Sequence, residues 1–342
     1  MSKRGGNKLK YQIERAIDRI NRIGVSKSEL RSEGKMTGIH SLNQIEHALS
    51  VNQNFGKWLK EQGVKDLFQL KRSHYRNYIA FMQTKGVSNG HLINVETNLR
   101  LLEKGMAEIS KDKGHETRSW IPKERLISPS EREKPQDRSV DTEKLSELRE
   151  KLPEGSKIAF DLQRAFGLRL REAANTKTAH IVERDGKLYW VASSDKNAPN
   201  SAKGVTKAGR GRETPCMPSQ EARVREILEM RANSPFVCPN GYNTLKSAYN
   251  RVGLEGSHSL RHTYSREMFK IELEQKGIVD QGRKMVQRIL ENRSGGYRKD
   301  HQVRAEEKGL YREVVKSMDI VQSYLGHGKG RIDLAEVYLG GL

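Results

Sequence analysis

Residues 257–342 hold the side chains best suited to chemistry. Two short clusters stand there, His-Ser-Leu-Arg-His at 258–262 and Leu-Gly-His at 325–327, and Tyr338 follows near the C-terminus. Imidazoles can transfer protons, a guanidinium can hold phosphate oxygens, and a phenol can act as a nucleophile. Together these groups can break a phosphodiester without a metal ion, so the pattern predicts phosphoryl transfer on a nucleic acid.

The composition favours a polyanionic partner. The 342 residues include 63 Lys and Arg against 43 Asp and Glu, a formal net charge of +20. A membrane surface is the competing partner, but no apolar run is long enough to span a bilayer and the N-terminal residues do not resemble a signal peptide. We therefore expect a cytoplasmic protein. Cys216 and Cys238 are too few for a disulfide framework and lack metal-ligand spacing.

The N-terminal part of the chain reads as a small helical domain. Apolar residues recur at three- and four-residue spacing between 92 and 106, as on one face of a helix. Helix boundaries are predicted at two serine N-caps and two glycine stops: Ser41, Ser88, Gly63 and Gly86. These signals predict a small all-helical domain over residues 36–112, and the family resemblance described below implies that it binds DNA.

The segments on either side of this domain differ in composition. Residues 1–35 are rich in Lys and Arg, with an amphipathic helix expected around 11–23, and form either a solvated tail or a contact to the DNA backbone. Residues 113–140 carry three prolines and mixed charges, which predicts an extended linker. A second domain is expected from 141 to 342.

The second domain combines helices with a few strands. Helices are predicted over 142–152 and 156–174, strands over 179–183 and 187–192 with Asp185-Gly186 as their turn, and mostly helices beyond 219. The predicted fold class is mainly α with a small antiparallel β-sheet.

The order of the motifs adds a resemblance to a known family. Gly-Leu-Arg-Leu-Arg-Glu at 167–172 is followed by Lys207, by His-x-x-Arg at 258–261, by Leu-Gly-His at 325–327 and by Tyr338. In this order they resemble the catalytic domain of the tyrosine recombinases, the phage-type integrases. The helical block before 112 is similar to the core-binding domain of that family. The resemblance implies a two-domain architecture, with a helical core-binding domain and an α+β catalytic domain.

The resemblance also implies roles for the arginines. Arg169 and Arg261 would hold the two non-bridging oxygens of the scissile phosphate, and the planar guanidinium suits this task because it donates in a fork. Arg171 is the rival of Arg169. We prefer Arg169 because Glu172 then lies one helical turn beyond it and can orient the guanidinium.

The remaining roles concern proton transfer and nucleophilic attack on the scissile phosphate. Lys207 would protonate the departing 5′ oxygen, with Lys196 and Lys203 as rivals in the same polar stretch. His258 would accept a proton or hydrogen-bond at the phosphate, and His327 would donate to a phosphate oxygen. Tyr338 would be the nucleophile and form a 3′-phosphotyrosine. The alternative tyrosine, Tyr324, precedes the Leu-Gly-His motif, and His262 is expected to be structural.

A basic segment at about 270–316 separates Arg261 from His327. A break between helices is predicted near 294–297, and the segment either faces DNA or another subunit or is a solvated surface insertion.

These features together predict a site-specific DNA recombinase, the integrase of a mobile genetic element. We expect it to act on double-stranded DNA as a homo-tetramer, without cofactor or metal, and with an accessory DNA-bending or directionality factor as a further partner. A type IB topoisomerase and a DNA-binding regulator with a decayed site are the alternatives.

Overall fold

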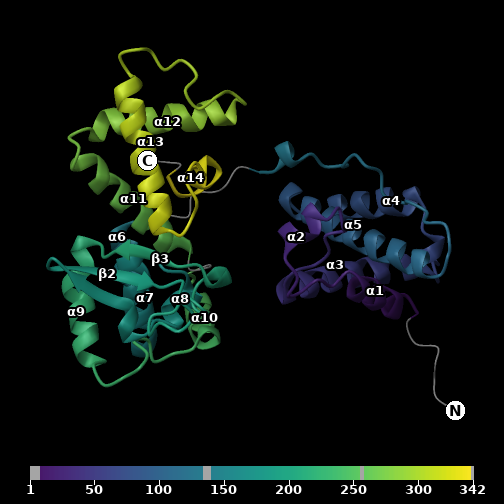
Figure 1. Cartoon of the computed structure of the whole chain (residues 1–342), viewed down its shortest axis with the longest axis horizontal. Coiled ribbons are helices and arrows are strands. Elements are labelled where there is room, and N and C mark those ends of the chain that lie inside the picture. The colour runs from purple at the N-terminus through teal and green to yellow at the C-terminus, as the bar shows by residue number, and fades with distance from the viewer. Residues whose placement is uncertain (1–7, 134–139, 255–257, 340–342) are drawn as a thin grey trace. The chain divides into compact units, whose positions relative to one another are not determined.

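The computed structural model describes residues 8–133, 140–254 and 258–339. The chain divides into two compact units, Met1–Lys134 and Pro135–Leu342 (Figure 1). Within the described residues, the first unit is helical and the second combines helices with a three-stranded antiparallel sheet. The predicted fold class is therefore confirmed. Residues 134–139 of the predicted linker lie outside the described residues. No helix in the described ranges has the length and apolar character needed to cross a membrane.

The first unit is built from five α-helices in its described part. They are α1 (Lys8–Arg19), α2 (Lys27–Ser32), α3 (Leu42–Glu61), α4 (Arg72–Thr84) and α5 (Asn89–Asp112). The hydroxyls of Ser41 and Ser88 accept from backbone N–H groups of the first turns of α3 and α5. Gly63 and Gly86 adopt positive φ angles of 77° and 67° just after α3 and α4. All four predicted helix boundaries are confirmed.

Helix α1 belongs to the core of this unit. Ile13, Ile17 and Ile20 are fully buried, and α1 packs against both α3 and α5. Gly105 of α5 allows the close approach, because a Cβ there would collide with the carbonyl oxygen of Ala16. The segment 1–35, which we expected to stand apart from the helical domain, therefore supplies one of its core helices.

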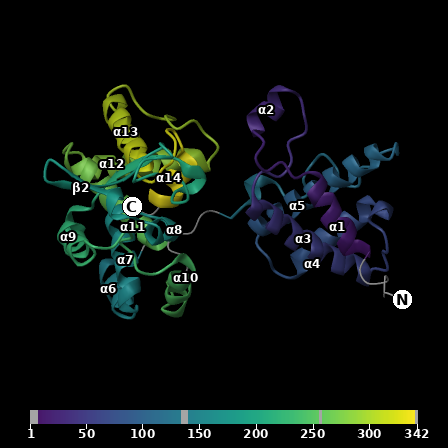
Figure 2. The same ribbon diagram turned by 60° about the horizontal axis from the view of Figure 1, so that its bottom comes forward.

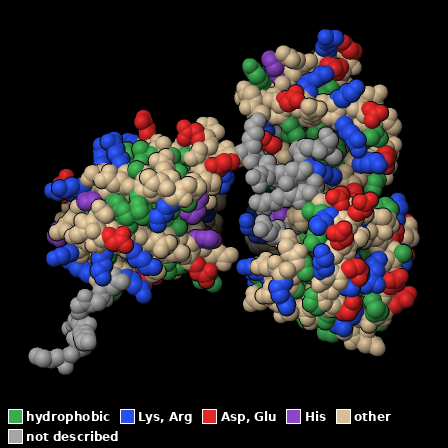
Figure 3. Space-filling view, turned by 180° about the vertical axis from the view of Figure 1, so that it is seen from behind, with side chains coloured by type: hydrophobic (Ala, Val, Ile, Leu, Met, Phe, Trp, Pro, Cys, Tyr) green, Lys and Arg blue, Asp and Glu red, His purple; other side chains and the backbone are tan. Residues whose placement is uncertain are grey.

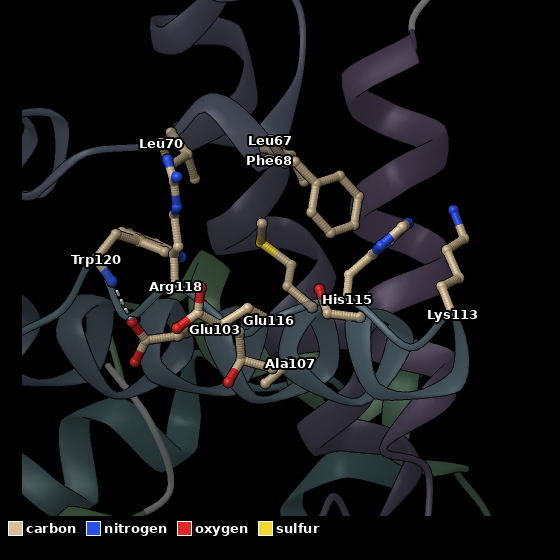
Figure 4. Close-up of a pocket in the computed structure, with 13 residues that line it drawn as sticks. Leu67, Phe68, Leu70, Glu103, Ala107, Lys113, His115, Glu116, Arg118 and Trp120 are labelled. Atoms are coloured by element: carbon tan, nitrogen blue, oxygen red, sulfur yellow. Dashed lines mark hydrogen bonds between the residues drawn. The ribbon is translucent and has the colours of Figure 1, made fainter.

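The chain after α5 folds back over the same unit. Trp120, Ile121 and Ile127 are buried, and the Glu103 carboxylate accepts from the backbone N–H groups of Trp120 and Ile121 at 2.7 and 2.8 Å (Figure 4). Phe68 lies across a pocket of about 410 Å³ from this segment (Figure 4). The first part of the stretch predicted as a linker is thus packed onto the helical unit by apolar side chains.

The second unit begins with helices around a sheet. The helices are α6 (Thr142–Glu150), α7 (Glu154–Phe166), α8 (Leu170–Ala174), α9 (Glu221–Met230) and α10 (Tyr242–Arg251), and the strands are β1 (Ile181–Arg184), β2 (Lys187–Ala192) and β3 (Arg212–Pro215). The strand order is β1-β2-β3. Asp185 and Gly186 have φ angles of 50° and 72° and close the β1–β2 hairpin, which confirms the predicted turn.

One predicted helix is interrupted. The pattern indicated a single helix over 156–174, but α7 ends at Phe166 and α8 begins only at Leu170. Gly167 lies between them with a φ of 59°, and a Cβ on it would collide with the ring of Tyr264. The prediction of a continuous helix was therefore wrong, because a tertiary contact and a left-handed residue end α7 early.

A second helical layer completes this unit (Figures 1 and 2). It consists of α11 (His258–Glu274), α12 (Val279–Ser294), α13 (Lys308–Tyr324) and α14 (Ile332–Leu339). Buried residues of α12 and α13, including Met285, Ile289 and Val321, join Tyr338 in one apolar core. The segment 270–316 breaks after Ser294, as predicted, and one face of its helices forms the core around the candidate nucleophile.

Candidate active site

The break after α7 places Arg169 and Glu172. Arg169 is the N-cap of α8, and its backbone N–H and Nη1 donate to the two carboxylate oxygens of Glu172 at 2.7 and 2.9 Å. The Glu172 carboxylate is buried, which raises its pKa, but Arg212, Arg261 and Arg169 together lower it below its ordinary value. Glu172 is therefore an ionised carboxylate that orients the guanidinium of Arg169, as its spacing had suggested.

Arg261 lies at the centre of the cluster. It is fully buried on α11, and its Nη1 donates to the carbonyl oxygen of Gly167 at 2.5 Å while Nη2 donates to the carbonyl oxygen of Leu325. Burial, together with the neighbouring charges of Arg212 and Arg169, lowers the pKa of its guanidinium to about 10. Arg261 remains a cation at neutral pH and joins the α7–α8 break to the Leu-Gly-His turn.

His327 is held by two neighbours. Its Nδ1 lies 2.6 Å from Oε1 of Gln322, which can only accept, so the proton is on Nδ1 in this arrangement. Its Nε2 lies 3.5 Å from Nη2 of Arg261 and faces a donor. Burial and the positive charges of Arg261, Arg169, Arg212 and Arg331 lower the His327 pKa to about 3. The imidazole is therefore neutral at physiological pH.

This low pKa predicts a pH dependence of stability. An unfolded histidine has a pKa near 6.5, so below that pH the unfolded chain binds a proton that the folded chain refuses. The free energy of unfolding should fall as pH decreases from about 6.5 toward 3. We expect His327→Gln to reduce that fall by at most about 1 kcal/mol per pH unit, measured by urea unfolding at pH 7 and pH 5.

A matched control is available in the same unit. His301 is exposed, so His301→Gln should leave the difference between the two pH values as in the wild type. If the free energy of unfolding falls equally in His327→Gln and in the wild type between pH 7 and pH 5, the pKa of His327 in the folded protein is not lowered as stated above.

Tyr338 is brought against these groups by α14. The centre of its ring lies 5.7 Å from Cζ of Arg261, 5.4 Å from the ring of His327 and 4.7 Å from the ring of His262. Ser265 donates through its hydroxyl to the Tyr338 carbonyl oxygen at 3.3 Å and ties α14 to α11. His262, which we expected to be structural, packs against the candidate nucleophile.

His258 occupies a different position. It is exposed at the start of α11 and, with Arg169 and Lys246, lines a cavity of about 380 Å³. The rival arginine, Arg171, lines the same cavity. His258 and Arg169 therefore border the same cavity, which connects this edge of the cluster to solvent.

The structure leaves Lys207 apart from the cluster. It begins a short turn, Lys207–Gly209, in the long connection between β2 and β3, and its exposed side chain has no hydrogen bond or ion pair to any described residue. Lys196 and Lys203 stand on the same connection and are also exposed. The motif is therefore on a hairpin, as the resemblance implies, and the choice among the three lysines stays a prediction.

Two members of the site were missed by sequence reasoning. Arg212 on β3 donates through Nη2 to Oε2 of Glu172 at 2.8 Å, and Gln322 on α13 holds His327. The sequence pattern could have indicated Arg212, because residues two positions apart in a strand share a face and Thr214 on that face is buried. Gln322 had none, since a glutamine on a helix carries no pattern of its own.

The site as a whole is an anion-binding cluster beside a tyrosine. The guanidiniums of Arg169, Arg212 and Arg261 converge on one carboxylate, Glu172, so positive charge is in excess. Such an arrangement can bind a phosphate and stabilise negative charge that develops on it. Among the described residues, no group of three or more His, Cys, Asp or Glu side chains could hold a metal ion.

Comparisons with known proteins give the fold. No protein-family model and no curated protein matches the chain. Among solved structures, the XerH site-specific recombinase bound to its difH substrate has a TM-score of 0.55 at 13% identity, covering 97% of this chain and 91% of that chain. A lambda integrase (75–356) dimer bound to a COC′ core site has a TM-score of 0.54 at 13% identity, covering 97% and 96%. The chain has the fold of the tyrosine recombinases, as predicted.

Proposed function

We propose that this chain is a site-specific DNA recombinase that cleaves and rejoins strands through Tyr338 and integrates or excises a mobile genetic element. The observation that carries the proposal is the placement of Tyr338 beside Arg261 and His327, with ring contacts of 5.7 and 5.4 Å. The order of the sequence motifs identifies the same three residues. A buried cation and a neutral imidazole next to a phenol are suited to phosphoryl transfer.

The reaction proceeds by two exchanges at phosphorus. The Tyr338 oxygen attacks the scissile phosphate and loses its proton to a base, for which His258 is the candidate. The bond from phosphorus to the 5′ oxygen breaks, and Lys207 supplies the proton that this oxygen takes up. A 5′ hydroxyl from another strand then attacks the phosphotyrosine and releases Tyr338. Each step replaces one phosphate ester by another, so the cycle needs no external energy source.

The arginines and His327 act on the phosphate itself. Arg169 and Arg261 would hold its non-bridging oxygens through their forked donors. His327 is neutral in the free protein because burial and the surrounding positive charges both lower its pKa. A phosphate anion would offset those charges and raise the His327 pKa, so that Nε2 could take a proton and donate to an oxygen. The Nε2 group of His327 would therefore become a hydrogen-bond donor only when DNA is bound.

The fold and the charge support a proposal about the partners. XerH and lambda integrase were each solved bound to DNA, and the latter as a dimer on its core site. For this chain we propose double-stranded recombination sites as substrate, a homo-tetramer as the assembly that exchanges strands, and an accessory DNA-bending or directionality factor. On the face shown in Figure 3, each unit carries several Lys and Arg side chains that could contact DNA phosphates.

A plasmid assay tests the function against its nearest rival. One plasmid would carry the DNA that flanks the coding sequence on both sides, as two candidate sites, and a second plasmid would lack it. We expect deletion or inversion between the sites in the first plasmid and no change in the second. Relaxation of both plasmids without rearrangement would instead identify a type IB topoisomerase, and no change in either would contradict strand exchange.

Non-specific DNA binding should depend steeply on salt. A protein of net charge +20 displaces many condensed counterions when it binds a duplex. We expect the association constant for a 30-base-pair duplex of unrelated sequence to fall by about a thousandfold or more between roughly 50 and 200 mM salt, measured by fluorescence anisotropy. A constant that changes less than about tenfold would indicate that few phosphates are contacted, against the proposal.

A further inference from the structure

Arg212 connects three parts of the candidate site. Its Nη2 donates to Oε2 of Glu172 at 2.8 Å, and its Cζ lies 5.0 Å from the centre of the Trp190 ring. Gly326 also lies against this side chain, and an added Cβ there would stand 3.0 Å from Cδ of Arg212. Gly326 also has a φ of 69°, which favours glycine. The Arg212 side chain, only 5% exposed, thus fills the space between α8, the sheet and the turn that carries His327.

The charges around Arg212 are unbalanced. The side chains of Arg169 and Arg212 each bind one oxygen of Glu172, whereas Arg261 donates to backbone carbonyls. Three guanidiniums therefore face one carboxylate. Among the described residues, Nε and Nη1 of Arg212 have no hydrogen-bond partner. Burying cations without matching anions is costly, so an arrangement of this kind is suited to a site that receives an anion.

The hydrogen bonds show what Arg212 does for Arg169. With Oε2 of Glu172 engaged by Arg212, the Arg169 side chain is bound through a single N–H, Nη1, to Oε1. Without Arg212, Oε2 would keep only the backbone N–H of Arg169 at 2.7 Å, and its second lone pair would be open to the Arg169 guanidinium, which prefers bidentate pairing with a carboxylate. Arg169 would then turn its donors toward Glu172, and fewer would remain for a phosphate.

We propose that Arg212 is a positioning residue of the phosphate site, which occupies one oxygen of Glu172 and thereby keeps Arg169 free to bind the scissile phosphate. This inference rests on the proposed function. The positive charge of Arg212 also contributes to the excess that the site offers to a phosphate, whose negative charge increases in the transition state.

The test is a double-mutant cycle on strand cleavage. Arg212→Met, Glu172→Gln and the double variant would be assayed for the rate of covalent adduct formation with nicked duplexes tiling the DNA that flanks the coding sequence. A charge-assisted hydrogen bond changes a rate by about 10- to 100-fold, and we expect a loss of that size for Arg212→Met. Adding Glu172→Gln should recover at least about tenfold, because a neutral amide no longer captures Arg169.

A matched pair on the same sheet serves as control. Arg184 donates through Nη1 to Oε2 of Glu213 at 2.8 Å, and its Cζ lies 5.7 Å from the Tyr189 ring, but both charged side chains are about half exposed. Arg184→Met, with or without Glu213→Gln, should change cleavage by less than about twofold. Comparable losses from both pairs would show that any change in this sheet impairs cleavage, and would overturn the proposal.

The outcomes separate this inference from the proposed function. If the wild type forms no adduct that depends on Tyr338, the proposed function fails and this inference with it. If the wild type cleaves but Arg212→Met cleaves equally well, or the double variant is no better than Arg212→Met, only the role of Arg212 is overturned. Should Arg212→Met not reach the wild-type melting temperature, Arg212→Lys keeps the charge beside Glu172 and is expected to cleave within about tenfold of the wild type. A folded lysine variant with a loss beyond about a hundredfold would also contradict the proposal.

Discussion

Tyr338→Phe is expected to abolish the covalent protein–DNA adduct. The change removes one oxygen from a side chain that is 5% exposed and keeps the ring contacts to Arg261, His262 and His327. Fold and DNA affinity should therefore be retained. Without the phenol no phosphotyrosine can form, so the amount of adduct should fall by at least about a thousandfold. The measurement is a denaturing gel after incubation with nicked flanking duplexes, in a buffer without metal ions.

Tyr324 provides the matched control. It lies at the end of α13 in the same unit, and its hydroxyl donates to Oε1 of Glu272 at 3.2 Å. Burial and the Glu272 carboxylate raise the pKa of Tyr324, which makes its phenolate harder to form. Tyr324→Phe should leave adduct formation within about threefold of the wild type. An adduct that persists in Tyr338→Phe and disappears in Tyr324→Phe would reverse the assignment.

The second large effect is expected for Arg261→Lys. Lysine keeps the positive charge but cannot reach the carbonyl oxygens of Gly167 and Leu325 in the same fork. A buried carbonyl that loses its donor costs about 1–3 kcal/mol, so the melting temperature should fall. Cleavage should fall by about a hundred- to a thousandfold, because the donor geometry at the phosphate is lost with the guanidinium. Thermal unfolding and the adduct assay measure the two effects separately.

Arg251→Lys is the corresponding control. Arg251 is exposed at the end of α10 and donates through Nε to the backbone oxygen of Ser247, within its own helix. The free energy of unfolding should change by no more than about 0.5 kcal/mol, and the cleavage rate by no more than about twofold. If Arg261→Lys cleaved at the wild-type rate while its melting temperature fell, Arg261 would be a residue of the fold alone and the phosphate would be held elsewhere.

Local signals account for much of what could be predicted. Ser41 and Ser88 cap helices through their own side chains, and Asp185-Gly186 closes a hairpin because both residues tolerate positive φ. These features depend on neighbours a few positions away, so they can be read without a fold. The spacing of apolar residues indicated the helices that follow these two serines, because it too depends on residues a few positions apart. It failed at Gly167, where α7 ends because the ring of Tyr264, nearly a hundred positions later, leaves no room for a Cβ.

In the candidate site, too, the sequence indicates the chemical groups and the tertiary structure brings them together. The types and order of Arg169, Arg261, His327 and Tyr338 were sufficient to nominate a phosphoryl-transfer site, because few chemistries need that combination. Their meeting depends on the core of α11 to α14, which no local pattern encodes. The basic segment 270–316 looked like an addition to the fold, yet its buried faces help to form the core that contains Tyr338.

The sequence by itself predicted a polyanionic partner and determined the helical character, the local turns and the chemical groups of the site. Only the tertiary structure decided that α1 belongs to the helical core, that Arg212 shares Glu172 with Arg169, and that Gln322 holds the ring of His327 beside Arg261. The physical reason is that charge, periodicity and turn preference are properties of short stretches. Ion pairing, burial and the pKa shifts that follow depend on which distant residues the packing brings within a few ångströms.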